Sequence, residues 1–283
     1  TGIFPLGTHS VSLFVQNLDN LCYDSITQVF EIHPLPNANF STNSVCEGEY
    51  IFFNDLSSSN VNYWNWEMGD GSIQSNLQYP SYLYPVAGNY LVKLSVISDE
   101  GCQDSISKEV IVNHIPNANF ISYDACEGKR SILVDKSEVI GANLISWTYT
   151  FPDGSIDTNI NSAYIFQKYG NYSVELTVVS DQGCESEIVN QVVVHPRPNI
   201  DFSIQNKCLG DITIFTDKTT LEYGIITQWD WSFGDNIGGA DYQNPSYQYV
   251  EEDNYLISLT VSSDKGCEDS ITRYHRVYAL PFV

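Results

Sequence analysis

The sequence predicts an all-β chain, folded as a tandem array of antiparallel β-sandwiches. Three observations predict this class. A tryptophan-bearing strand recurs at offsets of 83 and 82 residues, cysteines recur at nearly the same period, and short stretches of alternating apolar and polar residues fill each period. A segment that recurs at a fixed period belongs to a module, so each residue is interpreted by its place in the repeat.

The tryptophan strand runs into an acidic turn in each copy, over residues 64–71, 147–154 and 229–236. Large apolar residues stand two apart in it, so they share one face of the strand. A face that carries such groups in every copy is expected to be the core face, although a sugar-stacking platform is the alternative. The predicted core signature is Trp64, Trp66, Trp147, Tyr149, Trp229 and Trp231.

Each repeat has an early and a late cysteine. We predict one disulfide per repeat, closing each module on itself, in the pairs Cys46–Cys102, Cys126–Cys184 and Cys208–Cys267. Closing loops of this size stabilises a module by about 4 kcal/mol in the chain-entropy model. Paired cysteines at this density predict an oxidising, extracellular location. The seventh, Cys22, matches the late cysteines and is expected to pair with a cysteine outside these 283 residues.

The cysteines and proline-bearing joints predict the domain boundaries. Residues 1–35 are expected to be the C-terminal part of a preceding repeat, and residues 280–283 the start of a next one. Three whole repeats lie between them: the first (36–115), the second (116–197) and the third (198–279). Proline restricts its own φ and the conformation of its predecessor, so the joints are expected to be semi-rigid. His33, His114 and His195 recur at these joints and are expected to pack between adjacent modules.

About seven short strands per repeat, separated by turn signals, indicate an immunoglobulin-like sandwich. The repeat resembles the PKD (polycystic kidney disease) domain family. The resemblance rests on the W-x-F-G-D-G turn, on the aromatic pair Tyr82-x-Tyr84, and on the G-x-Y-x-V-x-L-x-V strand over 88–96 and 170–178. It covers nearly the whole chain and implies tandem PKD repeats of a large bacterial secreted or cell-surface protein, of the adhesin or gliding-associated type. Pro152 and Asn236 replace glycines of this turn.

The net charge of −23 disfavours binding to nucleic acid and to anionic membranes. No run of about 18 apolar residues is present, so we expect no direct membrane insertion. Nucleophile, zinc and phosphate-binding motifs are absent, and nothing clearly breaks the repeat symmetry as a catalytic site would. We therefore expect no enzyme activity within these residues.

Two kinds of candidate site recur with the repeat. Asp70, Asp153 and Asp235 are expected to accept hydrogen bonds from backbone N–H groups of their turns. Calcium is the alternative ligand, although the turn lacks a dense run of carboxylates; otherwise no cofactor is expected. The tripeptides around Ser25, Ser105 and Ser270 resemble the D-[ST]-[aliphatic] O-glycosylation acceptor of Bacteroidetes, which would make the chain a glycoprotein.

The leading functional hypothesis is a structural stalk or spacer of an extracellular multi-repeat surface protein that supports cell adhesion or gliding motility. Adjacent repeats would be the main partners. Three alternatives stay open: a module that binds surface glycans or other surface proteins, an accessory region of a secreted hydrolase, and a self-assembling surface filament.

Overall fold

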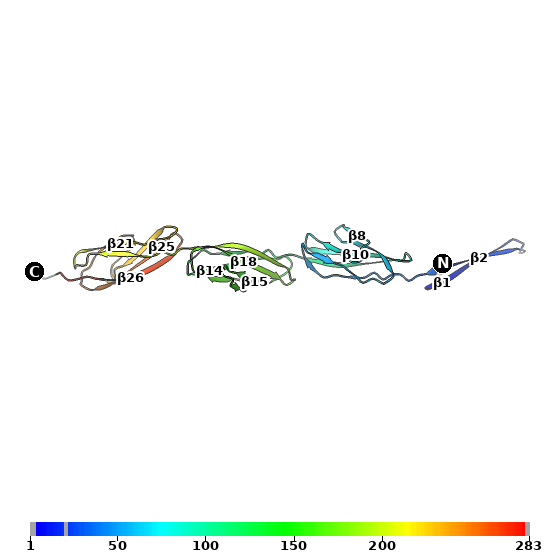
Figure 1. The fold of residues 1–283 in the computed structure, drawn as a ribbon, viewed down its shortest axis with the longest axis horizontal. Coiled ribbons are helices and arrows are strands. Elements are labelled where there is room, and N and C mark those ends of the chain that lie inside the picture. Colours follow the sequence, from blue (N-terminus) through cyan, green and yellow to red (C-terminus); the bar gives the residue numbers. More distant parts are fainter. Residues whose placement is uncertain (1–3, 20–21, 281–283) are drawn as a thin grey trace. The chain divides into compact units, whose positions relative to one another are not determined.

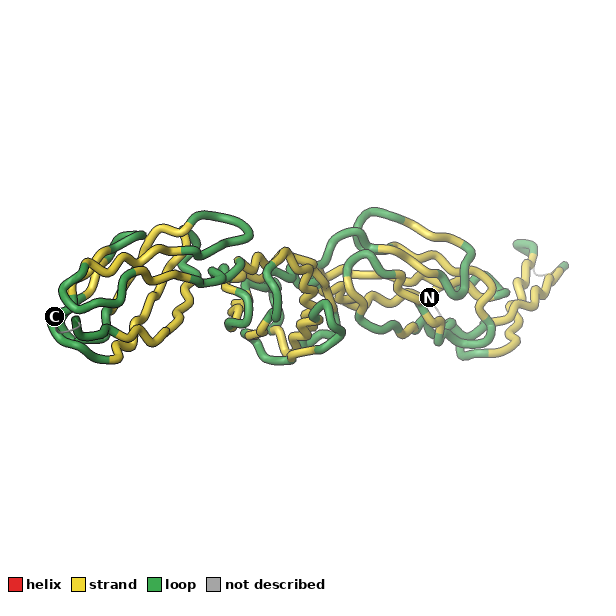
Figure 2. The backbone as a smooth tube through the Cα atoms, turned by 60° about the vertical axis from the view of Figure 1, so that its left-hand side comes forward, coloured by secondary structure: helices red, strands yellow, loops and turns green. Residues whose placement is uncertain are grey.

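The chain is all-β, as predicted. The computed structural model describes residues 4–19 and 22–280, and these residues form strands and turns without any helix (Figures 1 and 2). No helix in this part of the chain could therefore span a membrane. The expected start of a further repeat at 280–283 lies outside the described residues except for Leu280.

The N-terminal segment is a two-stranded antiparallel hairpin of β1 (Gly7–Gln16) and β2 (Tyr23–Ile32). Its register pairs Gly7 with Ile32 and Leu13 with Ile26. In the first repeat, β10 (Gly88–Ser98) and β11 (Gln103–Asn113) form a matching hairpin, in which Gly88 pairs with Val112 and Leu94 with Ile106. The hairpin of β1 and β2 is thus the counterpart of the last two strands of a repeat.

The first repeat is a sandwich of one five-stranded sheet, in the order β4-β11-β10-β7-β8, and two short strand pairs, β3–β6 and β5–β9. The early strands are β3 (Phe40–Ser41), β4 (Val45–Cys46), β5 (Tyr50–Phe52), β6 (Asn54–Asp55), β7 (Val61–Glu67), β8 (Ile73–Ser75) and β9 (Ser81–Leu83). Most neighbours are antiparallel, but β4 pairs with the end of β11 in parallel.

The second repeat has the same two layers, β13-β19-β18-β15-β16 and β12-β14-β17. Its strands are β12 (Phe120–Ser122), β13 (Ala125–Cys126), β14 (Arg130–Asp135), β15 (Leu144–Thr150), β16 (Ile156–Asp157), β17 (Ser162–Ile165), β18 (Gly170–Ser180) and β19 (Glu185–His195).

The third repeat stacks β23-β22-β25-β26 against β20-β21-β24. Its strands are β20 (Phe202–Gln205), β21 (Ile212–Asp217), β22 (Ile226–Ser232), β23 (Gly239–Ala240), β24 (Ser246–Gln248), β25 (Asn254–Ser263) and β26 (Glu268–Arg276). Cys208 forms an isolated parallel bridge with Tyr278, where β4 and β13 pair in the other repeats.

The tryptophan strands β7, β15 and β22 carry the centre of each core, as predicted. Trp66, Tyr149 and Trp231 are almost completely buried. Phe40 packs edge-on against Trp66, with 5.2 Å between ring centroids, and Phe120 and Phe202 take the same role in the other two repeats. The first tryptophan of each strand is only half-buried and packs at the edge of the same core: Trp64, Trp147 and Trp229.

The predicted disulfide pairing is wrong. The structure bonds Cys46 to Cys184 and Cys126 to Cys267, and leaves Cys22, Cys102 and Cys208 free. The predicted pairs Cys46–Cys102, Cys126–Cys184 and Cys208–Cys267 therefore do not form, and the bonds join successive repeats instead of closing each one.

The parallel strand β4 explains the error. Its Cys46 is the register partner of Asn113 at the C-terminal end of β11, whereas Cys102 directly precedes the N-terminal end of that strand. An eleven-residue strand spans about 35 Å. A disulfide requires Cα atoms about 4.4–6.8 Å apart, so the two cysteines of one repeat cannot meet.

Candidate functional site: the disulfides that join successive repeats

Each disulfide links the early cysteine of one repeat to the late cysteine of the next. Cys46 and Cys184 have Cα atoms 5.7 Å apart, and those of Cys126 and Cys267 are 5.6 Å apart. The sequence separations are 138 and 141 residues, so the two closed loops overlap. The chain divides into two compact units, and each disulfide lies within one of them. Cys46 and Cys184 lie in the first unit, because the turn 180–184 groups with residues 1–115, and Cys126 and Cys267 lie in the second.

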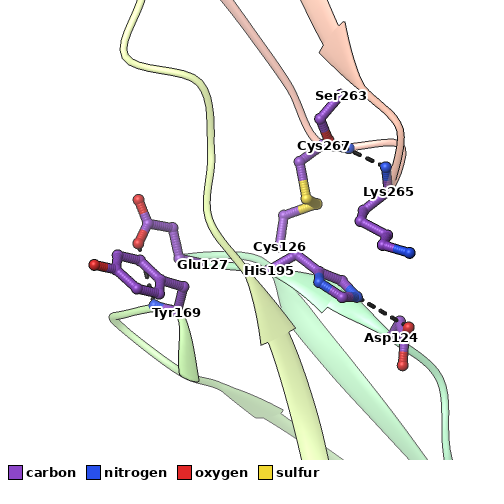
Figure 3. The surroundings of a disulfide bond; sticks show 8 residues. All are labelled: Asp124, Cys126, Glu127, Tyr169, His195, Ser263, Lys265 and Cys267. Carbon is purple, nitrogen blue, oxygen red and sulfur yellow. Dashed lines mark hydrogen bonds and ion pairs between the residues drawn. A yellow bond between two sulfur atoms is a disulfide. The ribbon is translucent and has the colours of Figure 1, made fainter. Parts of the chain in front are cut away.

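The early cysteine is held by the end of the last strand of its own repeat. The N–H of Glu127, next to Cys126, donates to the carbonyl of His195 at the end of β19 (2.9 Å). Glu47, next to Cys46, donates to Asn113 at the same distance. The Glu127 carboxylate accepts from the Tyr169 N–H (3.1 Å), which Figure 3 shows beside the disulfide. The early cysteine is thus fixed by backbone pairing and by the glutamate that follows it.

The late cysteine closes a tight turn between the two long strands of its repeat. In the third repeat, Ser263 N–H donates to the Cys267 carbonyl (2.9 Å), and Cys267 N–H donates to Ser263 Oγ (3.1 Å). Gly266 of this turn has φ of +71°, which favours glycine. The turns that end at Cys184 and Cys102 have the same two bonds, made with Ser180 and Ser98.

The sequence contains a signal for these turns beyond the spacing of the cysteines. The pattern S-D-x-G-C recurs over 98–102, 180–184 and 263–267. Its aspartate ties the turn to a neighbouring loop of the same repeat in two copies: Asp181 Oδ1 accepts from the Asn143 N–H, and Asp264 Oδ1 from the Ile225 N–H, both at 3.2 Å. The motif therefore builds a rigid tip on which the half-cystine is presented.

Polar and aromatic contacts surround the disulfide between the second and third repeats. His195 Nε2 lies 2.9 Å from Asp124 Oδ2 (Figure 3), so this histidine pairs within its own repeat and not with the next. Arg197, in the joint, makes an ion pair with Asp269 of the third repeat at 2.9 Å. The rings of Tyr169 and Tyr223 meet edge-on across the same two repeats, with centroids 5.8 Å apart.

The aspartates considered for calcium serve their own turns. Asp70 accepts from the Ser72 N–H (2.9 Å) and from the Tyr82 hydroxyl (2.6 Å). Asp153 and Asp235 make equivalent bonds with Ser155 and Tyr164, and with Ile237 and Tyr247. The expected backbone bonds are therefore confirmed. In the described part of the chain, no group of three or more His, Cys, Asp or Glu residues could hold a metal ion.

Hydrogen bonding to the turn carboxylates shows in their pKa values. The Ser155 hydroxyl, 2.6 Å away, and then the Tyr164 hydroxyl lower the pKa of Asp153 to about 2. Partial burial would raise the pKa of Asp70, but bonds from Tyr82 and Ser72 outweigh it, so this pKa is also lowered. Both carboxylates are hydrogen-bond acceptors that the turn stabilises in the charged form.

A second aspartate braces the half-buried tryptophan in two repeats. Asp55 Oδ2 accepts from Trp64 Nε1, and Asp217 Oδ2 from Trp229 Nε1, both at 2.8 Å. In the second repeat, the equivalent Trp147 Nε1 is buried without a hydrogen-bond partner. The first and third of these tryptophans are therefore fixed at both the ring face and the indole N–H, which does not suit an open sugar-stacking platform.

The candidate glycosylation serines lie on exposed strand positions. Ser25 is on β2, Ser105 on β11 and Ser270 on β26, and all three are exposed. The preceding aspartates of the last two have structural contacts: Asp104 accepts from the Ala38 N–H (2.8 Å), and Asp269 pairs with Arg197. Glycosylation of these serines stays a prediction.

The fold and the junctions define a class of protein, a tandem array of immunoglobulin-like sandwiches in which neighbouring repeats are covalently joined. The chain belongs to the PKD domain family: the family model described as "PKD domain" matches residues 33–112, 113–196 and 195–277. The PKD domain is a non-catalytic module.

Known proteins are similar to parts of this chain. A pre-pro-metalloprotease PrtV of Vibrio cholerae is 28% identical over 141 residues, which are 48% of this chain and 15% of that protein. The crystal structure of its PKD1 domain is 28% identical and covers 28% of this chain and 96% of that domain, with a TM-score of 0.26. The PKD1 domain of Vibrio anguillarum Epp is 27% identical over 30% of this chain and 96% of that domain, with a TM-score of 0.28.

Proposed function

We propose that the chain is a spacer segment of an extracellular surface protein, which bears tensile load while it holds other parts of that protein at a distance from the cell. The observation that carries the proposal is the pair of overlapping disulfides between successive repeats. Support for an extracellular location comes from the disulfides, which persist in oxidising compartments. A role in adhesion or gliding motility would depend on the other domains of the surface protein that the spacer holds.

The overlap of the two loops shortens the covalent path through the array. Without disulfides, the path from Cys46 to Cys267 follows 221 residues of chain. With both bonds, it crosses from Cys46 to Cys184, follows 58 residues back to Cys126, and crosses again to Cys267. Unfolding of all three repeats therefore releases much less length in the oxidised chain.

Single-molecule force spectroscopy tests the proposal. At about 3.6 Å per residue, the segment between Cys46 and Cys267 should extend to about 20 nm when oxidised and to about 80 nm when reduced. The variant Cys46→Ser with Cys126→Ser, pulled without reductant, is the matched control and should reach the longer length. Equal contour lengths in the oxidised and reduced chains would refute a load-limiting role.

A second candidate is a non-catalytic accessory segment of a secreted hydrolase. The match to part of a pre-pro-metalloprotease favours it, although this chain spans only 15% of that protein's length. The spacer role would be the same, but the cargo would be a catalytic domain. Sequencing the regions that adjoin residues 1–283 in the gene product distinguishes the two: a hydrolase domain supports the accessory role, and further repeats with surface anchors support the stalk.

A further inference from the structure

The N-terminal hairpin exposes a face that is core in every complete repeat. Val11, Leu13 and Val15 of β1 are 51%, 60% and 54% exposed. The register of the hairpin makes them the counterparts of Val92, Leu94 and Val96 of β10, each 0% exposed. Ile26 faces Leu13 across the hairpin and is 69% exposed, whereas Ile106 packs against the core of the first repeat.

The complete repeats show what covers this face. In the first repeat, Leu94 pairs with Trp66 of β7, and the cluster that buries it includes Phe40, Ile51 and Phe53. All of these covering residues come from the early half of the repeat, between residues 36 and 80. The second and third repeats cover β18 and β25 with the same elements.

Cys102 gives an independent indication of the same partner. Its turn has the two Ser–Cys bonds of the bonded turns, at 2.8 and 3.2 Å, and Gly101 has φ of +84°. Cys184 and Cys267, in the equivalent turns, are each bonded to the early cysteine of the preceding repeat. Cys102 is free. Of the repeat that precedes it, these residues contain only the hairpin of β1 and β2, which corresponds to the last two strands of a repeat.

We infer that the uncovered face of β1 and β2 is the docking surface for the early half of a PKD repeat, and that the cysteine of this segment bonds to Cys102. The partner would resemble residues 36–80, with its cysteine in the place of Cys46. Cys22 would stay free in the completed repeat, because the pattern pairs a late cysteine with the repeat before its own. The two thiols would lose two electrons and two protons to oxidised glutathione, which becomes two molecules of reduced glutathione.

An extended chain tests the inference. A copy of residues 36–80 is fused before Thr1 of the full chain, and the product is oxidised in glutathione buffer. Peptide mapping by mass spectrometry without reduction should find a new disulfide between the added cysteine and Cys102, while Cys22 remains open to alkylation. Hydrogen exchange at β1 should slow at least tenfold relative to the unextended chain.

A matched control separates covering from bonding. The same extension with its cysteine changed to serine should still protect β1, but should leave Cys102 open to alkylation. A second extension, a copy of residues 198–245, guards against a faulty design of the first. Fast exchange at β1 in both extended chains, or an added cysteine bonded to Cys22, would overturn the inference. Either result would leave the spacer function standing, because the bonds Cys46–Cys184 and Cys126–Cys267 do not depend on it.

Discussion

The first and second repeats have cores of the same design but differ in the polar contacts around them. The first repeat bonds Trp64 Nε1 to Asp55 and the Tyr84 hydroxyl to the Met68 carbonyl (2.7 Å). The second repeat has an unpaired Trp147 Nε1, and Phe166, which has no hydroxyl, stands in the place of Tyr84.

The second repeat is held by disulfides at both its cysteines, through Cys126 and Cys184. In the first repeat only Cys46 is bonded. The buried strand positions therefore define the fold, whereas hydrogen bonds at the edge of the core and covalent bonds between repeats are alternative ways to stabilise it.

The largest effect is expected from loss of both disulfides. Reduction should lower the free energy of unfolding of the second repeat by about 2–5 kcal/mol, the range for native disulfides. The first repeat should lose less, because only one of its two cysteines is in a disulfide, and because Trp64 Nε1 and the Tyr84 hydroxyl are hydrogen-bonded within it. Hydrogen exchange with mass spectrometry, with and without reductant, resolves the repeats. Equal losses in the first and second repeats would show that the second repeat does not depend more on its disulfides.

A smaller effect is expected at the acidic turn. Gly69 has φ of +85°, and a Cβ there would lie 2.9 Å from the backbone of Leu91. Gly69→Ala should therefore destabilise the first repeat by about 3 kcal/mol, from the left-handed conformation and the clash together. Gly71→Ala is the matched control, since Gly71 has φ of +95° but open space at its Cβ position, so only the conformational cost of about 1–2 kcal/mol remains. Urea unfolding followed by tryptophan fluorescence measures both, and equal losses would contradict the close-contact argument.

The aspartate that accepts from the indole N–H should matter in the first repeat but not in the second. Asp55→Ala removes the acceptor of Trp64 Nε1 and of Gln78 Nε2, so it should cost about 1–3 kcal/mol in the stability of that repeat. Asp135→Ala in the second repeat should cost less, because Asp135 accepts from the Ser137 N–H but not from Trp147. Thermal unfolding of the two variants compares them; a larger loss for Asp135→Ala would reverse the assignment.

The smallest effect is a pH dependence at the turn of the second repeat. The pKa of Asp153 is lowered to about 2, so its stabilising contribution is fully present above about pH 4 and is lost as the pH falls through about 2. Ser155→Ala removes the hydroxyl that contributes most to lowering the pKa of Asp153 and should raise this pKa toward its ordinary value. Carbon-detected NMR titration of the carboxyl groups follows it, with Asp70 as the internal control whose pKa should not move.

Much of the fold could be predicted because it is local and repeated. The alternation of apolar and polar residues around Trp66 and Tyr149 predicted the core face, and the aspartate of each acidic turn predicted the hydrogen bonds from backbone N–H groups. The bond of Trp64 to Asp55 could not be predicted, because it depends on packing between different strands.

The disulfide pattern failed for a physical reason. Equal spacing shows which cysteines are equivalent, but not which ones meet. Because β4 pairs in parallel with the C-terminal end of β11, Cys46 and Cys102 lie at opposite ends of β11. Such long-range pairing produces no periodic pattern in the sequence. The recurring S-D-x-G-C turn indicates where a half-cystine is presented, though not to which partner.

Disulfide mapping of residues 1–283, without any extension, is the decisive test of covalent junctions between repeats. The free thiols are alkylated, the unreduced protein is digested, and the linked peptides are identified by mass spectrometry. The structure predicts peptides that join Cys46 to Cys184 and Cys126 to Cys267, with Cys22, Cys102 and Cys208 alkylated. Peptides that join Cys46 to Cys102 or Cys126 to Cys184 would contradict covalent junctions between repeats.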